Sequence, residues 1–146
     1  MYKMKDVANE MDIPLSTIRY YERQGIVIGK RQENGYRIFD EEDKILLEYL
    51  IVMKHVGFSI EEIKELLNFL EFPESDECSE RSNQLLTKKE NDIRQKIKHE
   101  QMVLKLIQEL KPKIVAKEYA QYEEEISEEI HTIYKEIQQS KSGEKI

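Results

Sequence analysis

The chain has 146 residues with only three prolines and five glycines, which is typical of one small domain joined to long, rarely interrupted helices. Charged residues make up 36% of the chain and apolar residues 39%, a composition that favours solvated helices. No apolar stretch approaches the roughly 20 residues that cross a bilayer. The first residues also lack a secretory apolar run, so we expect a cytoplasmic protein without a membrane partner.

The net charge of −7 is spread unevenly, and its distribution decides which part of the chain can meet a nucleic acid. Residues 1–39 hold seven Lys/Arg and five Asp/Glu, a balance of +2. Residues 40–67 hold three and eight, giving −5, and residues 68–146 hold thirteen and seventeen, giving −4. Because salt limits the reach of each charge to about 10 Å, a local basic face on an acidic protein still binds DNA.

In chain order, apolar spacing predicts a first helix over residues 5–11 and a second helix that Pro14 opens and Gly25 ends. Two helices joined by a turn of a few residues match a helix-turn-helix. The run Thr17-Ile18-Arg19-Tyr20-Tyr21-Glu22-Arg23 places an arginine and two adjacent tyrosines on the second helix. This pattern is typical of a compact nucleic-acid reader.

Two short β-prone runs follow, Ile26-Val27-Ile28 and Tyr36-Arg37-Ile38-Phe39. Asn34-Gly35 stands just before the second run and is a strong hairpin signal. We interpret the two runs as the strands of a wing. The wing brings a second arginine and tyrosine close to those of the second helix.

The third and fourth helices are each predicted to begin with a capping box, in which the first and fourth residues bond each other's backbone. Asp40 and Asp43 form the first box, and Ser59 and Glu62 form the second. Gly57 ends the third helix. A broad apolar face is predicted on the third helix at Ile45, Leu46, Tyr49, Leu50, Val52, Met53 and Val56. The amino-terminal domain therefore spans residues 1–70.

The rest of the chain is predicted to be a linker (71–79), a long helix (80–114), a carboxy-terminal amphipathic helix (115–139) and a flexible tail (140–146). Residues 80–111 contain no Pro or Gly and allow a helix of roughly 48 Å at 1.5 Å per residue. This helix is polar around most of its girth and needs a partner helix, parallel or antiparallel. Its expected dimerisation seam, with heptad spacing, consists of Leu86, Ile93, Ile97, Leu104, Ile107 and Ile114. A neighbouring stripe consists of Val103, Leu106 and Leu110.

Three motifs occur together in a recognisable order: the run 17–23, the hairpin 34–39, and Gly57-Phe58-Ser59-Ile60-Glu61-Glu62-Ile63. With these motifs the chain resembles the MerR family of bacterial transcription regulators over about residues 3–70. The resemblance implies a mainly α-helical fold, in which a winged helix-turn-helix is followed by a long helix that pairs antiparallel in a homodimer. Beyond residue 70 the chain is most similar to small members without a large ligand-binding domain.

The resemblance also implies a mechanism and a set of partners. The homodimer is expected on double-stranded promoter DNA whose two promoter elements are spaced too far apart. An effector-bound form bends and untwists this DNA so that RNA polymerase engages both elements, with protein contacts offsetting a deformation energy of a few kcal/mol. A small-molecule effector is a candidate partner, and the sequence does not identify it.

Four residues of the second helix are candidates for DNA contact. Arg19 is expected on the exposed side, at a guanine or a phosphate in the major groove, with a solvated surface arginine as the alternative. Tyr20 is expected at the phosphate backbone or at a base edge. Ser16 and Thr17 start the helix, where hydroxyl and N–H groups suit phosphate, and capping or packing is an equal alternative.

The wing and the third helix supply the other candidates. By the resemblance, Arg37 matches the family arginine that grips phosphates, and Lys54 matches a basic residue that touches the DNA backbone in relatives. Tyr36 is either a further wing contact or a packing residue of the strand. Lys30 and Arg31 are either phosphate contacts on the wing side or parts of a solvated loop.

Cys78, the single cysteine, is the candidate sensor, because a thiol in a linker can meet an oxidant, an electrophile or a metal. Its acidic neighbours disfavour the reactive thiolate, however. Metal-sensing relatives use cysteine pairs that this chain lacks, and aldehyde-responsive relatives carry a cysteine where this chain has Met53. We therefore expect no metal site and no cofactor.

An enzyme is not expected, since the sequence shows no nucleophile–base set, no paired carboxylates for a pocket and no Gly-rich phosphate loop. Two further functions stay open beside the regulator. One is a coiled-coil scaffold whose amino-terminal domain binds another protein. The other is an architectural DNA-binding module without effector control.

Overall fold

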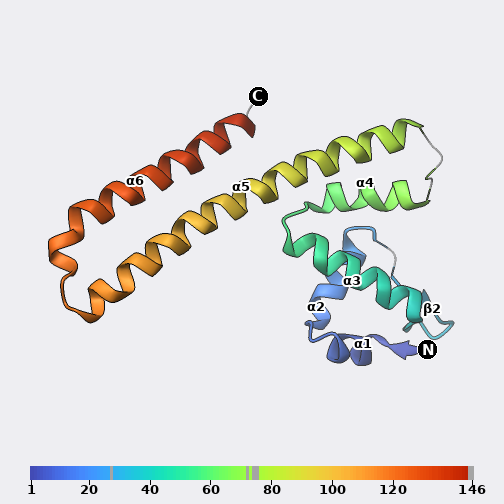
Figure 1. The fold of residues 1–146 in the computed structure, drawn as a ribbon. Helices are drawn as coiled ribbons and strands as arrows, with labels where there is room; N and C mark the ends of the chain where they lie inside the picture. The colour runs from blue at the N-terminus through green and yellow to red at the C-terminus, as the bar shows by residue number, and fades with distance from the viewer. Residues whose placement is uncertain (27, 72, 74–75, 145–146) are drawn as a thin grey trace. The chain divides into compact units, whose positions relative to one another are not determined.

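The computed structural model describes residues 1–26, 28–71, 73 and 76–144, without the side chains of residues 78 and 142–144. The chain forms two compact units, Met1–Leu85 and Leu86–Ile146, which are described separately (Figure 1). In chain order, the elements are β1 (Tyr2–Lys3), α1 (Met4–Glu10), α2 (Leu15–Arg23), β2 (Lys30–Arg31), β3 (Arg37–Phe39), α3 (Glu41–His55), α4 (Ile60–Glu71), α5 (Asp76–Val115) and α6 (Tyr119–Glu144). The mainly helical class predicted from the sequence is confirmed.

The helix-turn-helix is formed by α1 and α2, which pack through fully buried apolar side chains. Val7 and Ala8 of α1 meet Ile18 and Tyr21 of α2 in the core of the first unit. Pro14 caps the start of α2, where its missing N–H leaves no helical hydrogen bond unmade. Gly25 follows the helix at a φ of 86°, the left-handed conformation that ends it.

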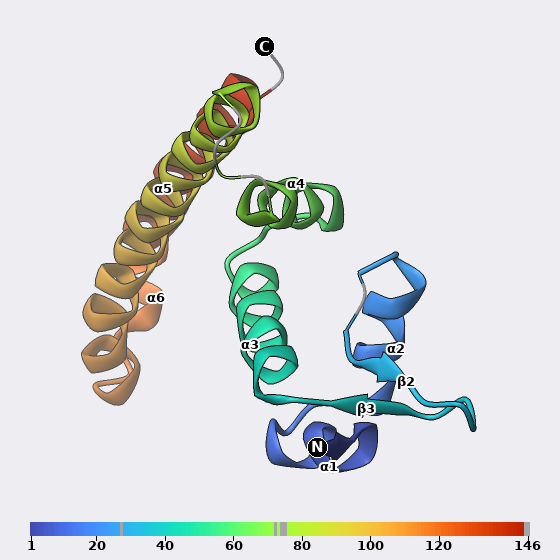
Figure 2. The same cartoon turned by 90° about the vertical axis from the view of Figure 1, so that its right-hand side faces the viewer.

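A small antiparallel sheet lies beside these helices in the order β1-β3-β2, with α1 and α3 on opposite sides of β3 (Figure 2). The strand predicted at residues 26–28 is wrong. Ile26 and Ile28 are buried core residues without strand pairing, and Val27 lies outside the described residues. Strand β2 begins at Lys30, four residues after the predicted start, and pairs Arg31 with Arg37 of β3. Strand β1 is an element that the sequence did not predict.

The hairpin between β2 and β3 is confirmed, and its turn differs in type from a two-residue Asn-Gly turn. The N–H of Gln32 donates to Tyr36 O at 2.8 Å, and the N–H of Gly35 donates to Gln32 O at 2.9 Å. Gly35 has a φ of 83°. This is a three-residue loop, a type I turn followed by a left-handed glycine bulge, and Asn34 Oδ1 accepts from the Tyr36 N–H at 3.1 Å.

Both predicted capping boxes of the first unit are confirmed. Asp43 N–H donates to Asp40 Oδ1 at 3.0 Å, and Asp40 N–H donates to Asp43 Oδ2 at 2.9 Å. Ser59 and Glu62 exchange the same pair of bonds, at 2.9 and 3.1 Å. Each box satisfies two backbone donors that the first turn of a helix leaves unpaired.

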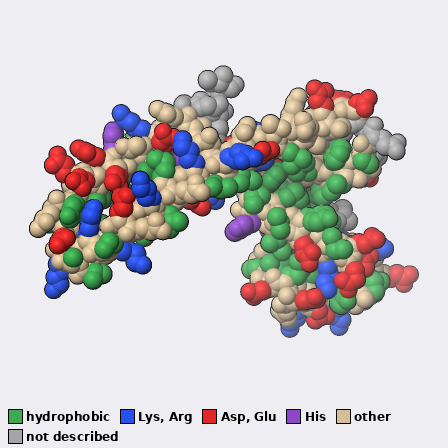
Figure 3. Space-filling view, viewed as in Figure 1, with side chains coloured by type: hydrophobic (Ala, Val, Ile, Leu, Met, Phe, Trp, Pro, Cys, Tyr) green, Lys and Arg blue, Asp and Glu red, His purple; other side chains and the backbone are tan. Residues whose placement is uncertain are grey.

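The core face of α3 is narrower than predicted. Leu47 and Leu50 are fully buried, and the predicted apolar residues Leu46 and Met53 are half-buried against the core. The other predicted members of that face, Ile45, Tyr49, Val52 and Val56, are exposed in the single chain. Figure 3 shows hydrophobic side chains exposed over α3 and α4 on one side of the unit.

The second unit is an antiparallel pair formed by α5 and α6. Leu106 of α5 packs with Ile126 and Ile133 of α6, and Lys98 Nζ bonds Glu136 at 2.9 Å across the two helices. Among the described residues, no helix has the length and apolarity needed to cross a lipid bilayer.

The boundaries of this part differ from the predicted ones. Helix α5 begins at Asp76, inside the segment expected to be a linker, because Asp76 and Glu77 put negative charge at its amino end. It passes Pro112, which removes only one N–H donor so close to the end. Helix α6 extends to Glu144 through most of the expected tail, and residues 145–146 lie outside the described part.

Candidate nucleic-acid interface

A hollow of about 1080 Å³ opens between α2, the wing and the amino-terminal residues of the first unit. Among the described residues that line it, Glu22 is the only acid. The basic side chains that line it are Lys3, Lys5, Arg19, Arg23, Arg31 and Arg37. The hollow therefore gathers most of the positive charge that the sequence places in residues 1–39.

Helix α2 presents two arginines to this hollow. Arg19 and Arg23 are both exposed, and a separation of four residues stacks them on one side of the helix. Ile18 and Tyr21 point the other way and are buried. Arg19 thus lies on the exposed side of α2, as the sequence predicted. Arg23 was not predicted, although it follows Arg19 by four residues and therefore shares its side of the helix.

Lys3, the last residue of β1, and Lys5, in the first turn of α1, also line the hollow and were also missed. The Tyr2 hydroxyl donates to Glu41, and Lys44 Nζ lies 4.5 Å from the centre of the Tyr2 ring. The hydrogen bond to Glu41 raises the pKa of Tyr2. These contacts hold the first residues of the chain against α3. In the sequence, only the close spacing of Lys3 and Lys5 indicated that these residues could bind DNA.

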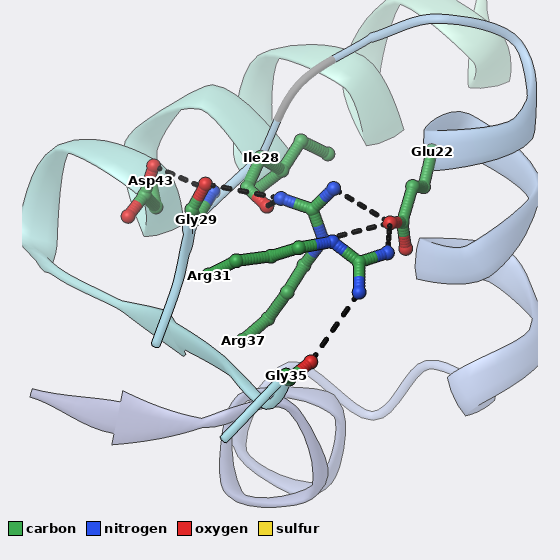
Figure 4. Close-up of polar contacts among 7 residues, drawn as sticks. All are labelled: Glu22, Ile28, Gly29, Arg31, Gly35, Arg37 and Asp43. Atoms are coloured by element: carbon green, nitrogen blue, oxygen red, sulfur yellow. Dashed lines mark hydrogen bonds and ion pairs between the residues drawn. The ribbon is translucent and has the colours of Figure 1, made fainter. Parts of the chain in front are cut away.

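Arg31 and Arg37 both reach for the carboxylate of Glu22, as Figure 4 shows. Arg37 donates to Glu22 Oε1 from Nε at 2.8 Å and from Nη2 at 2.6 Å. Arg31 Nη2 donates to the same oxygen at 2.9 Å. The hydrogen bonds from Arg37, ahead of the charges of both arginines, lower the pKa of Glu22, which is therefore ionised at neutral pH.

Arg37, which was expected to grip DNA phosphates, is largely covered by its own domain in the free chain. Its side chain is only 14% exposed, and Nη1 donates to the carbonyls of Ile28 at 3.4 Å and Gly29 at 3.2 Å. The physical reason is strand alternation, since Arg37 shares a face of β3 with Phe39, which is fully buried. The sequence shows that Arg37 and Phe39 share a face of the strand, but which face packs on the core depends on the register between strands.

The base of the wing is crowded around Gly29. Its φ is 80°, and a Cβ built there would lie 2.7 Å from the Ile38 carbonyl oxygen. Its N–H donates to Asp43 Oδ1 at 3.0 Å. Gly29 therefore joins the wing to the capping box of α3, in a position that only glycine fits without strain.

Of the other predicted DNA-binding residues, only Tyr36 is among the described residues that line the hollow. Tyr20 is half-buried against the core, with its ring 5.7 Å from that of Tyr21. Ser16 and Thr17 sit in the first turn of α2. Lys30 is exposed beside the hollow, in a long 3.9 Å pair with Asp40. The remaining candidates are Lys54, exposed in the last turn of α3, and Tyr36, which does line the hollow and is 74% exposed.

The predicted dimerisation seam is not covered by α6. Leu86, Ile97, Leu104, Ile107 and Ile114 are exposed and Ile93 is half-buried. The stripe that packs on α6 contains Leu106, and Leu104 lies about 160° from it around the helix axis. The seam and the α6 contact are therefore on different sides of α5. The side chain of Cys78, the candidate sensor, lies outside the described residues.

A winged helix-turn-helix with a basic hollow between the second helix and the wing defines a class of DNA-binding domains. The family model of MerR HTH family regulatory proteins matches residues 2–70, and the model described as MerR, DNA binding matches residues 47–110. The chain belongs to the MerR family.

Relatives of this chain include named regulators and solved structures. It is 36% identical over 81 residues to the HTH-type transcriptional regulator ZntR of Escherichia coli K12, covering 55% of this chain and 57% of the relative. The chain thus spans little more than half the length of that curated relative. It is 29% identical over 111 residues to the mercuric resistance operon regulatory protein of Bacillus cereus, covering 75% of this chain and 83% of that protein.

Two solved structures share the fold over most of the chain. A MerR family transcriptional regulator from Bacillus thuringiensis matches with a TM-score of 0.61 at 32% identity, covering 77% of this chain and 97% of that one. HiNmlR, a MerR family regulator lacking the sensor domain and bound to promoter DNA, matches with a TM-score of 0.66 at 25% identity, covering 82% and 93%.

Proposed function

We propose that this protein is a dimeric transcription regulator of MerR type that binds promoter DNA and bends and untwists it in response to an effector. The observation that carries the proposal is the hollow beside α2, where six lysines and arginines face a single acid among the described residues. Phosphate contacts of this kind supply most of the affinity of DNA-binding proteins. RNA polymerase at the promoter is the further partner that this function requires.

Arg19 is the residue that we propose as the base reader. It stands on the exposed side of a recognition helix whose opposite side is fixed in the core by Ile18. A guanidinium in the major groove bonds the two acceptors of guanine. Arg23, one turn further along, is proposed at a phosphate, together with the amino-terminal lysines Lys3 and Lys5.

The wing is proposed to contact the DNA backbone through Arg31 and Tyr36, whose side chains are exposed in the hollow. Lys30, Lys54, Ser16 and Thr17 are proposed as contacts at its margins. Phosphate contacts of this kind set the register of the protein on the duplex, while Arg19 reads sequence.

The homodimer is proposed to form through the seam on α5. Isoleucine and leucine side chains at heptad spacing are exposed there, and burying them against a second copy removes apolar surface from water at about 25 cal/mol per Å². An antiparallel pairing places two readers on one duplex, which suits a near-palindromic operator. Cys78 stays a candidate sensor for an effector.

The test is an electrophoretic shift with DNA from the protein's own upstream promoter region. We expect binding that weakens steeply with salt. Arg19→Ala is expected to cost more than about 1 kcal/mol and to relax the preference for the promoter sequence over unrelated DNA. The matched control is Arg94→Ala, which removes the same charge from an exposed position on α5 and should bind like the unaltered chain. Equal binding by all three proteins would refute the assigned reader.

A further inference from the structure

The wing carries two arginines that repel each other unless a third residue intervenes. Arg31 and Arg37 are direct cross-strand partners, so their side chains leave the same face of the hairpin. Like charges in this position destabilise a strand pair. Glu22 of α2 reaches across, and one of its oxygens accepts hydrogen bonds from both guanidinium groups (Figure 4). The shape of the wing therefore depends on a residue of the recognition helix.

Glu22 holds the two arginines unequally. Arg37 is 14% exposed and makes four hydrogen bonds, two to Glu22 and two to carbonyls at the base of the wing. Arg31 is 62% exposed and gives Glu22 one bond. A phosphate can replace the carboxylate at Arg31 in solvent. If a phosphate bound Arg37 instead, Glu22 and the two carbonyls at the base of the wing would lose their part-buried hydrogen bonds, which is costly.

We infer that Glu22 is a positioning residue for DNA binding, which acts through Arg37 to hold the wing against α2 and releases Arg31 to a DNA phosphate. This inference rests on the proposed function. It assigns Arg37 to the internal support of the wing and leaves the phosphate contact to its exposed neighbour.

Removing the charge of Glu22 distinguishes this inference from the alternative that Glu22 only repels DNA, because the two predict opposite changes in DNA affinity. A carboxylate inside a basic hollow repels DNA, so its charge alone predicts that removing it tightens binding. If Arg37 were a phosphate ligand, removing Glu22 would also free it for the DNA. If Glu22 positions the wing, removing its charge loosens Arg37 and separates the wing from α2, and binding weakens despite the gain in positive charge.

The experiment uses the full chain and the duplex that it selects from a randomised library. Glu22→Gln is expected to bind this duplex roughly three- to ten-fold more weakly, since hydrogen bonds to a charged group are replaced by weaker ones. The matched control is Glu33→Gln in the exposed turn of the same wing, which is expected to bind about two-fold more tightly through charge alone. Circular dichroism confirms that each variant is folded at the temperature of the measurement.

Three further variants keep the test independent of folding defects. Arg37→Lys keeps the charge and loses the planar fork, so it is expected to weaken binding as Glu22→Gln does. The double variant is expected to be no weaker than either single one, because both break the same contact. Arg31→Ala is expected to lower the salt slope by about 1, and Glu22→Gln to leave it unchanged.

Three results would overturn the inference. These are tighter or equal binding by Glu22→Gln, binding by Arg37→Lys at the level of the unaltered chain, and effects of the two substitutions that simply add. Failure of the chain to enrich any duplex is a separate outcome, since it refutes the proposed function itself.

Discussion

Substituting Gly29 by alanine tests how tightly the wing is held at its base. Gly29 and Gly35 have nearly the same backbone conformation, with φ of 80° and 83°. Their surroundings differ. A Cβ at Gly29 would lie 2.7 Å from Ile38 O and 3.1 Å from Phe39 Cε1, whereas a Cβ at Gly35 would meet nothing within 4 Å. Gly35→Ala is therefore a matched control that carries the backbone cost without the collision.

The expected magnitudes follow from these contacts. A left-handed backbone costs a residue with a Cβ about 1–2 kcal/mol, and Gly35→Ala should destabilise by that amount. Gly29→Ala adds the cost of overpacking, about 1–3 kcal/mol, because the atoms it meets are the backbone of β3 and a fully buried ring. Its total of about 2–5 kcal/mol is a large fraction of the stability of a small domain, which is about 5–15 kcal/mol.

The measurement is urea unfolding of both variants by circular dichroism. Both are measured at the same protein concentration, because the stability of the proposed dimer would depend on it. A DNA shift on the same samples should show Gly29→Ala weakened beyond Gly35→Ala, since the Gly29 carbonyl and N–H bond Arg37 and Asp43. Equal free energies of unfolding for the two variants would refute the reasoning. The residues around Gly29 would then accommodate the added Cβ without any loss of stability.

Three other perturbations have expected outcomes. Leu104→Asp or Ile93→Asp puts a charge into the proposed seam and should give monomers by analytical sedimentation. Gln95→Asp, at an exposed position on the opposite side of α5, should stay dimeric, and a dimer in all three variants would place the seam elsewhere. The lowered pKa of Glu22 means that its contribution to stability is present above the unfolded carboxyl pKa and lost as pH falls through the folded one, so Glu22→Gln should approach the unaltered chain in thermal stability only in acid. If the difference in thermal stability between Glu22→Gln and the unaltered chain stayed constant as the pH was lowered, the ion pair would be contradicted. Ser59→Ala removes one cap bond of α4 and should cost about 1 kcal/mol in urea, and no change would mean that α4 begins without it.

The parts of the fold that the sequence predicted are those with short-range causes. The capping boxes at Asp40 and Ser59 need only residues three positions apart, and Gly25 ends a helix by its own conformation. Strand β1 has two residues, too few for any periodic signal, and exists because Tyr2 bonds α3 some forty positions away. The orientation of Arg37 depends on register between strands, which a single sequence does not fix.

The prediction of a broad apolar face on α3 was wrong for a related reason. Helical spacing shows which residues share a side, and it does not show how much of that side a partner covers. Leu50 is buried and Tyr49, next to it, is exposed, although both belonged to the predicted face. The burial of each residue on that side depends on packing between elements, which the local sequence pattern does not predict.

Helix α2 shows how nine residues can serve three purposes at once. At about 100° per residue, neighbouring positions point to different neighbours. Ile18 and Tyr21 face the core, Arg19 faces the hollow, and Glu22 reaches sideways to the wing. Each direction is fixed by the other two, because turning the helix to expose Glu22 would also unbury Ile18. The position of the wing is thereby tied to the orientation of α2, the proposed recognition helix, and a substitution at Glu22 should disturb both together.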